Sequence, residues 1–165
     1  MGKTLENLQA AFAGESQANR KYLAFAERAD QEGYHQVARL FRAAAAAETV
    51  HAHSHLRTMG GIKTTAENLE AAIGGENYEA VSMYPAFLED ARAEEESRAI
   101  RTFEYALEAE KVHEQLYRSA LTKLGEEADA FDYYVCPTCG YTHERGAPER
   151  CPVCGVKGER FLHIQ

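Results

Sequence analysis

The sequence predicts an all-α protein, a bundle of four long helices followed by a small metal-binding module. Over the first 125 residues, apolar side chains recur every three to four positions, in runs that contain a single proline, Pro85. The last thirty residues hold the other three prolines and all four cysteines, which form two Cys-x-x-Cys pairs. The chain therefore changes near residue 130 from a helical composition to a loop-rich one.

Composition bounds the class of protein. With 165 residues, 45% of them hydrophobic and 27% charged, the chain is long and apolar enough for one domain and a small second module. Acidic residues outnumber basic ones by 26 to 18, giving a net charge of -8, which argues against nucleic acid or anionic lipid as a partner. No apolar run approaches the roughly 18 residues of a membrane span. The N-terminus also lacks a signal-peptide pattern, so we expect a cytoplasmic protein.

Glycines and a capping motif divide the helical part. The periodicity predicts long helices over about residues 4–33, 34–60, 76–95 and 97–125, with a short helical segment at 64–74. Thr64 and Glu67 have the spacing of a capping box at the start of that segment, and Gly74-Gly75 are expected to end it. The link between the second and third long helices is then the longest, as a crossover connection requires.

Two of the helices carry the same motif. Residues 41–51 follow the pattern Phe-x-x-Ala-x-x-Ala-Glu-x-Val-His, and residues 103–113 repeat it at identical spacing. A glutamate precedes each copy at nearly the same distance, 33 residues before the first motif's glutamate and 34 before the second's. Each half of the bundle is thus predicted to pair a helix that carries an early glutamate with a helix that carries Glu-x-x-His.

This repeat predicts a dinuclear metal site. A glutamate and a histidine three residues apart lie on one helix face, here beside apolar residues expected to be buried. A buried carboxylate costs several kcal/mol unless a cation or hydrogen-bond donors compensate it. One such pair alone is weak support, because solvated pairs are common, but two matched copies strongly favour a carboxylate site for iron or manganese. Its candidate ligands are Glu15, Glu48, His51, Glu76, Glu110 and His113.

Three further residues accompany these ligands. Glu79 follows Glu76 by three residues, where the first half has Ala18, so it is either a surface acid or a seventh ligand that breaks the symmetry of the site. Tyr22 and Tyr84 follow the early glutamates. They are either ordinary core tyrosines or hydrogen-bond donors to a ligand carboxylate.

The cysteines predict a second metal site. Two Cys-Pro-x-Cys-Gly motifs supply four thiolates, which in a reducing compartment bind zinc or a single iron rather than form disulfides. Their spacing alone does not separate a structural zinc ribbon from a redox iron site. We place the domain boundary in the acidic linker 126–130, giving domains 1–130 and 131–165. The four candidate ligands are Cys136, Cys139, Cys151 and Cys154.

Taken together, these motifs resemble the rubrerythrin family over essentially the whole chain. The segments Ile73-Gly-Gly-Glu-Asn-Tyr-Glu79 and Met83-Tyr-Pro85 look like the third-helix motif of that family. The resemblance implies a ferritin-like diiron bundle and a rubredoxin-like Fe(Cys)4 domain. It also implies a role for each ligand: bridging for Glu48 and Glu110, terminal for Glu15 and Glu76, and binding of one iron for His113. The other iron would exchange Glu79 for His51 as its oxidation state changes.

The resemblance also implies an activity. Rubrerythrins act as peroxidases that reduce hydrogen peroxide to water, with electrons relayed through the rubredoxin-type iron, and this activity would protect against oxidative stress. We therefore expect hydrogen peroxide as substrate, a redox donor protein (a rubredoxin or an NAD(P)H-dependent reductase), and a homodimer. Catalytic roles fall to Glu79, Tyr22 and Tyr84, and zinc could replace iron at the cysteines in recombinant material.

Two other functions stay open, and so does the arrangement of the two subunits in the dimer. One is ferroxidase or iron-storage chemistry, as in ferritin-like proteins; the other is a non-enzymatic zinc ribbon on a structural bundle. The short linker and the short loop before the third helix leave both a head-to-tail and a helix-exchanged dimer open.

Overall fold

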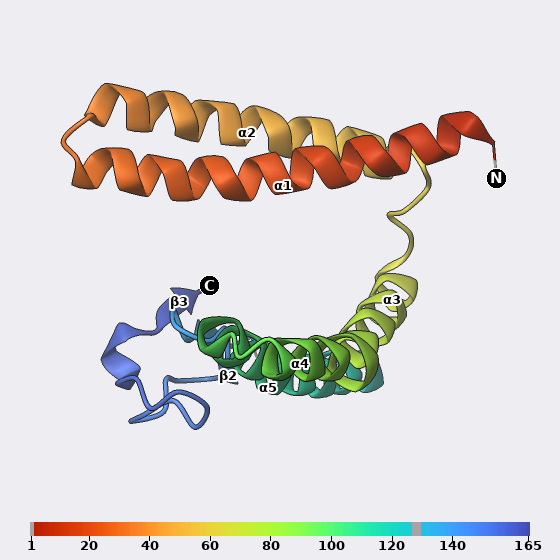
Figure 1. The fold of residues 1–165 in the computed structure, drawn as a ribbon. Helices are drawn as coiled ribbons and strands as arrows, with labels where there is room; N and C mark the ends of the chain where they lie inside the picture. Colours follow the sequence, from red (N-terminus) through yellow and green to blue (C-terminus); the bar gives the residue numbers. More distant parts are fainter. Residues whose placement is uncertain (1, 127–129) are drawn as a thin grey trace. The chain divides into compact units, whose positions relative to one another are not determined.

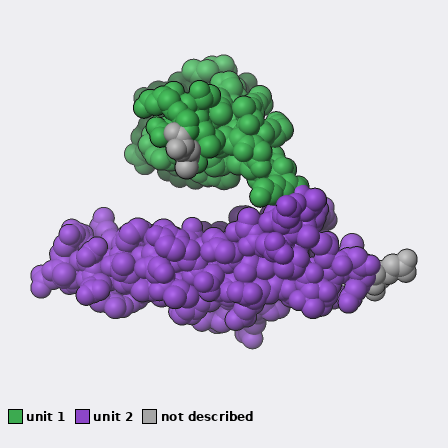
Figure 2. Space-filling view, turned by 90° about the vertical axis from the view of Figure 1, so that its right-hand side faces the viewer, with its two compact units in different colours: residues 1–63 green, residues 64–165 purple. Residues whose placement is uncertain are grey.

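The computed structural model describes residues 2–126 and 130–165. They form two compact units, Met1–Lys63 and Thr64–Gln165, coloured separately in Figure 2. The predicted all-α fold with a small C-terminal metal-binding module is confirmed (Figure 1). The predicted boundary falls in a linker of which residues 127–129 lie outside the described part of the chain, so the division at residue 130 stays a prediction.

The first unit is a helical hairpin. Helices α1 (Lys3–Gln31) and α2 (His35–Thr58) run antiparallel and pack along their length. Gly33 makes the tight turn between them with a φ of +85°, a conformation that glycine adopts without steric cost. Among the described residues of this unit, the five buried side chains are all alanines. The small side chains let the two helices approach closely, whereas larger apolar side chains such as Phe25 and Val37 stay exposed.

The second unit begins with a composite helix. Its parts are α3 (Thr65–Tyr78), a π-helical segment η1 (Glu79–Met83) and α4 (Tyr84–Ala93). Thr64 caps α3 with the predicted capping box. The predicted break at Gly74-Gly75 is wrong, because α3 continues through both glycines into η1. Glycine lowers helix propensity by about 1 kcal/mol, a cost that packing can override.

This continuity shortens the link between the hairpin and the composite helix. Because the residues from Thr65 onward are helical, only Met59–Thr64 connect α2 to α3. This link is shorter than expected, but it is still the longest between the helices of the described residues.

The π-helix accounts for a difference between the two halves in the number of residues from the early glutamate to the tyrosine. Glu15 precedes Tyr22 by seven residues, whereas Glu76 precedes Tyr84 by eight. In a regular α-helix the extra residue would turn Tyr84 about 100° away from the face that carries Glu76. A π-helical turn takes up one additional residue, so η1 restores the register between the two halves.

Helix α5 (Ser97–Thr122) completes the helical part and packs against α3, η1 and α4. The small module follows with a three-stranded antiparallel sheet in the order β2-β1-β3. Its strands are β1 (Tyr133–Val135), β2 (Thr142–Glu144) and β3 (Leu162–Ile164), and a short 3-10 turn, η2 (Gly158–Arg160), precedes β3.

The module lies against α5 of its own chain. Tyr105 of α5 packs on the buried cluster formed by three of the cysteines and Phe161. Ala109, one helical turn further along, is 2% exposed, and a Cβ placed on Gly140 would lie only 3.8 Å from its side chain. The cysteine module and the second Glu-x-x-His motif are therefore held side by side within one compact unit. In the described part of the chain, no helix is long and apolar enough to cross a membrane.

Candidate metal centres

The hairpin brings three of the predicted ligands together. We call Glu15, Glu48 and His51 the first triad; each offers a ligand atom within 4.8 Å of the others. The Nδ1 atom of His51 lies 2.9 Å from Glu48 Oε2 and 3.9 Å from Glu15 Oε1. Glu48 and His51 share a face of α2 because they are one helical turn apart, and antiparallel packing brings Glu15 of α1 opposite that face.

The second unit repeats this geometry. The second triad is Glu76, Glu110 and His113, whose ligand atoms also lie within 4.8 Å of one another. His113 Nδ1 is 2.7 Å from Glu110 Oε2 and 3.7 Å from Glu76 Oε2. The structure thus brings the six ligands predicted from the repeat into two matching groups of three, one on each unit. Their role as iron ligands stays a prediction.

Burial sets the electrostatics of the second triad. Burial, together with a hydrogen bond to Glu110 and the charge of that carboxylate, raises the pKa of Glu76 to about 7. The hydrogen bond between the same Glu110 and His113 lowers the pKa of Glu110 and raises that of His113. Crowding carboxylates of like charge in this way costs free energy that a bound cation removes.

Glu79 lies close to the second triad without belonging to its closest group. Its side chain is partly buried, and burial followed by the negative charge of Glu110 raises its pKa. It occupies the first position of the π-helix η1. The carboxylate is therefore electrostatically linked to the second triad, as a seventh ligand or a proton carrier would have to be.

The two tyrosines lie in matching aromatic clusters. Tyr22 packs beside Phe25 and Phe41, with ring centroids 6.3 and 6.2 Å away. Tyr84 packs in the same way beside the equivalent phenylalanines of the second unit, with centroid separations of 6.3 and 6.1 Å. Burial, then the charges of Glu110, Glu79 and Glu76, raise the pKa of Tyr84, which places its hydroxyl near the carboxylates and keeps it protonated.

The cysteine site has the geometry of a tetrahedral metal centre. Cys136 Sγ lies 3.5 Å from Cys154 Sγ, and Cys139 Sγ lies 3.4 Å from Cys151 Sγ. These separations approach the edge of about 3.8 Å of a tetrahedron whose metal–sulfur bonds are about 2.3 Å long. The four sulfur atoms also lie within 4.8 Å of one another.

Each cysteine pair forms the same backbone turn. Gly140 donates its N–H to the carbonyl of Cys136 at 3.0 Å, and Gly155 donates to Cys151 at 2.9 Å. Both glycines have positive φ, +81° and +75°, so other residues would be strained there. Burial raises the pKa of Cys136, but hydrogen bonds from backbone N–H groups outweigh it and lower the pKa overall, which favours the thiolate that a metal requires.

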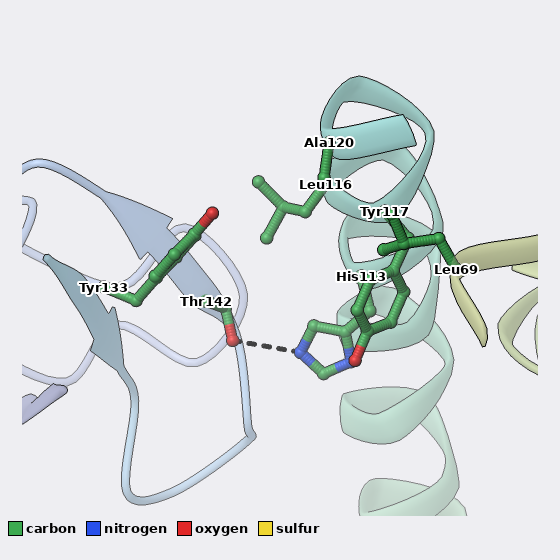
Figure 3. Close-up of a pocket in the computed structure, with 7 residues that line it drawn as sticks. All are labelled: Leu69, His113, Leu116, Tyr117, Ala120, Tyr133 and Thr142. Atoms are coloured by element: carbon green, nitrogen blue, oxygen red, sulfur yellow. Dashed lines mark hydrogen bonds between the residues drawn. The ribbon is translucent and has the colours of Figure 1, made fainter. Parts of the chain in front are cut away.

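His113 connects the two candidate centres. Its Nε2 atom lies 3.2 Å from the carbonyl oxygen of Gly140 and 3.0 Å from Thr142 Oγ1, the contact drawn in Figure 3. A carbonyl oxygen can only accept, so Nε2 carries the proton and donates it. Nδ1, which lies 2.7 Å from the Glu110 carboxylate, is then the nitrogen that would bind a metal in place of its own proton.

A cavity of about 340 Å³ opens beside this contact. Figure 3 shows side chains of α5 and of the small module facing one another across it. The cavity is lined by Leu69, His113, Leu116, Tyr117, Ala120, Tyr133 and Thr142.

Sequence reasoning missed Thr142 and Gly140 as partners of His113. They lie 29 and 27 residues away in a different module, and no periodicity links them to α5. Gly140 could be recognised from the sequence as the last residue of a Cys-Pro-x-Cys-Gly motif. Its contact with His113 of α5 could not.

Comparison with known proteins gives consistent matches over both parts of the chain. The family model described as Rubrerythrin matches residues 6–121, and the one described as Rubrerythrin, rubredoxin-like domain matches residues 134–162. Rubrerythrin-2 of Clostridium acetobutylicum is 39% identical over 174 residues, covering 96% of this chain and 95% of the relative. Nigerythrin of Nitratidesulfovibrio vulgaris is also 39% identical, over 93% of this chain and 83% of the relative.

Comparison with solved structures gives the same family as the sequence comparisons. Nigerythrin in a partially reduced state superposes with a TM-score of 0.61 at 38% identity, covering 99% of this chain and 88% of the other. A second structure, of fully reduced, all-ferrous nigerythrin, gives a TM-score of 0.61 at 37% identity. That relative is therefore an iron protein. Both donor sets found here, carboxylate with imidazole and four thiolates, suit iron.

Proposed function

Because this chain belongs to the rubrerythrin family, we propose that it reduces hydrogen peroxide to water at a carboxylate-bridged diiron site, with electrons supplied through iron at the four cysteines. The overall reaction consumes one peroxide, two electrons and two protons and yields two water molecules. Family membership supports oxidoreductase chemistry in general. The choice of peroxide is our proposal.

One observation carries the proposal: the contact of His113 with Gly140. Its imidazole faces the second triad through Nδ1 and donates from Nε2 to the residue that follows Cys139. An electron leaving the cysteine site would reach a candidate diiron ligand through this one hydrogen bond. Iron storage has no use for such a connection, so the contact favours electron delivery over the ferroxidase alternative.

The triads would hold the irons, and the residues around them would manage protons. Bound iron would supply two electrons together and polarise the oxygen–oxygen bond. Glu79, whose pKa is raised by burial and by Glu110, can hold a proton near the substrate and release it to a departing oxygen. Tyr84, kept protonated by the same carboxylates, can donate a hydrogen bond to one of them. Tyr22 lies in the matching aromatic cluster of the first unit, and we propose the same role for it.

The partners follow from the electron balance. Each turnover consumes two electrons, so a redox donor protein, a rubredoxin or an NAD(P)H-dependent reductase, must reduce the cysteine site. The module is small, and its Cys154 is only partly buried, which leaves one edge of the site open to such a donor.

Anaerobic stopped-flow spectroscopy tests the proposal. The fully reduced, iron-loaded protein is mixed with a slight excess of hydrogen peroxide, and the visible Fe(III)–thiolate absorption is followed. We expect the colour to appear fast and stoichiometrically, and faster than after mixing with dioxygen. Slow appearance, no faster than with dioxygen, would replace peroxidase activity with ferroxidase or storage chemistry. Metal analysis beforehand should give about three irons per chain and no zinc, as two triads and one four-cysteine site require.

A further inference from the structure

We propose that Asn19 is a positioning residue for the first triad. Through hydrogen bonds to Ala45 and Thr49, it fixes how α1 and α2 lie against each other beside the candidate metal ligands. The inference rests on the metal site of the proposed function. Every residue involved belongs to the α1–α2 hairpin.

The contact is a hydrogen-bonded cross-link between the two helices. Asn19 Nδ2 donates to the carbonyl oxygen of Ala45 at 2.7 Å and to Thr49 Oγ1 at 2.8 Å. Thr49 donates its own hydroxyl proton to the same carbonyl at 3.1 Å, which leaves its oxygen to accept from the amide. Because a carbonyl oxygen only accepts, the NH2 end of the amide faces α2, and both of its N–H groups are used.

This Asn19 cross-link lies next to the first triad. Asn19 follows Glu15 by four residues, one helical turn and about 6 Å along the same face of α1. On α2, Thr49 directly follows Glu48, and Ala45 precedes Glu48 by three residues. Because a helix is rigid over a single turn, the cross-link determines where the Glu15 carboxylate stands relative to that of Glu48.

Apolar packing alone specifies the register of these helices weakly. The buried side chains of the hairpin are all alanines, whose methyl groups form a nearly uniform surface. A small slide or rotation on such a surface loses few contacts, whereas a hydrogen bond is directional and breaks when its partners move apart. A single polar side chain in an otherwise apolar helix interface can therefore fix the register. Asn19 has that position in this hairpin.

The turn at the end of the hairpin cannot replace the cross-link. Residues 32–34 join the helices, and near them Asp30 accepts from Arg42 at 2.8 Å. Glu15 lies 15 residues before Asp30, about 22 Å along α1. Over that length a change of about 3° in the angle between the helices moves the carboxylate by about 1 Å, and metal ligands must be placed to within about 0.5 Å. The contact that places Glu15 must therefore lie close to it.

The second unit has no equivalent of this cross-link among its described residues. The repeat aligns its three members with Ala80, Leu107 and Lys111. The helices of the second unit are tied by a different pair: Asn77, next to a ligand of the second triad, donates to Glu114 at 3.3 Å. The first unit has Ser16 and Ala52 at those positions. Loss of Asn19 should therefore disturb the first triad and leave the second unchanged.

Substitution at either end of the cross-link tests the proposal. Asn19→Leu keeps the size of the side chain and removes both hydrogen bonds, and Thr49→Val keeps the shape and removes one acceptor. Neither leaves the Ala45 carbonyl without a partner, because it still accepts within α2. Thr49→Ser, which keeps the hydroxyl, and Asn7→Ala, which removes an exposed asparagine from the same helix, are the matched controls.

Anaerobic titration of the full-length, metal-free chain with Fe(II) measures the effect. Asn19→Leu should weaken iron binding at the carboxylates by about tenfold, as loss of a residue that orients metal ligands does, while the four-cysteine site in the same sample serves as reference. Thr49→Val should cause a smaller loss, and both controls should bind iron normally. The double variant should be no weaker than Asn19→Leu, because both residues act through one contact. Unchanged affinity in Asn19→Leu, or losses that add in the double variant, would overturn the proposal.

Spectra separate positioning from stabilisation. Mössbauer spectra of the loaded protein should show a changed quadrupole splitting of the carboxylate iron in Asn19→Leu and Thr49→Val, and wild-type values in Thr49→Ser. A residue that only stabilises the hairpin would lower the urea midpoint of the metal-free protein and leave iron affinity and spectra as in wild type; that result would refute the proposal.

None of these readouts uses peroxide. Wild-type protein that loads iron but ignores peroxide would refute the proposed function and leave the role of Asn19 standing. Wild-type iron affinity in Asn19→Leu would refute only the role of Asn19.

Discussion

The Nε2 atom of His113 donates a hydrogen bond to the carbonyl oxygen of Gly140 at 3.2 Å, joining a helix that carries candidate diiron ligands to the turn that holds two cysteines. The contact keeps a proton on Nε2 and links His113 through one hydrogen bond to the residue that follows Cys139. It lies within one compact unit of one chain. If both centres hold iron as we propose, an electron would therefore have a path between them within one chain.

Replacing Thr142 tests the orientation of His113. Thr142 accepts from Nε2 at 3.0 Å and donates to Gly140 at 3.2 Å, so Thr142→Val removes one of the two acceptors that hold the ring. Losses of this kind typically weaken metal binding by about tenfold. We expect that loss in iron titrations of the diiron site, with the cysteine site unaffected. Thr138→Val, at an exposed position between two cysteines, is the matched control and should bind iron normally.

Glu79→Ala tests the proposed proton carrier. If Glu79 delivers a proton to the departing oxygen, peroxide turnover should slow by about a hundredfold while both metal centres still load. Stopped-flow kinetics with iron-loaded protein measures the effect. Glu89→Ala, an exposed glutamate on α4, controls for the loss of a charge. Unchanged peroxide kinetics in Glu79→Ala would remove this residue from the mechanism.

A deletion in the π-helix should be tolerated. Removing Ser82 from η1 gives the second unit the seven-residue spacing of the first, so the segment can become regular α-helix with Tyr84 still on the face of Glu76. We expect the variant to fold and to bind three irons per chain.

The matched deletion is Lys21, an exposed residue between Glu15 and Tyr22. Helix α1 has no π-helical turn between these residues. The deletion therefore turns Glu15 about 100° away from Glu48 and His51. Iron analysis should show loss of the diiron site in this variant alone. Equal iron loss in both deletions would contradict the role assigned to η1.

The metal-free protein should lose stability as the pH rises. The pKa of Glu76 is raised from 4.5 to about 7 and that of His113 is raised above 6.5, so the folded state holds protons that the unfolded state has released. The free energy of unfolding should therefore fall from about pH 4.5 through pH 7 and above. Glu110, whose pKa is lowered, contributes stability that is lost only below about pH 4.5.

Urea unfolding of the metal-free protein at several pH values measures this dependence. Glu76→Gln cannot titrate and should reduce the slope between pH 5 and 7. Iron replaces the protons, so the loaded protein should instead lose stability as the pH falls. A metal-free protein that becomes more stable from pH 5 to 7 would contradict the electrostatics described here.

Removing the metal from the cysteines should unfold the small module. Its buried cluster consists of Cys136, Cys139, Cys151 and Phe161, too little apolar surface to fold residues 133–164 without a metal. Hydrogen exchange should show loss of protection in β1, β2 and β3 after chelation, with α1 and α2 unchanged. Retained protection in the strands would mean that packing on α5 suffices.

Much of the candidate site followed from the sequence because it depends on local periodicity. Glu48 and His51 share a helix face wherever residues 41–51 are helical, and the same holds for Glu110 and His113. The cysteine motifs specify their own turns through the glycines that follow them. The two Glu-x-x-His pairs and the turns of the cysteine motifs therefore needed no tertiary information.

Tertiary structure decided three other features. The sequence contained the extra residue between Glu76 and Tyr84, but only the structure shows that a π-helical turn of a continuous helix, packed against α5, takes it up. The contact of His113 with Gly140 joins residues from different modules, which no pattern along the chain encodes. The short connection from α2 to α3 became visible only in the structure, because α3 proved continuous through Gly74-Gly75. Periodicity fixes which side chains share a face, whereas packing and chain length fix which faces meet.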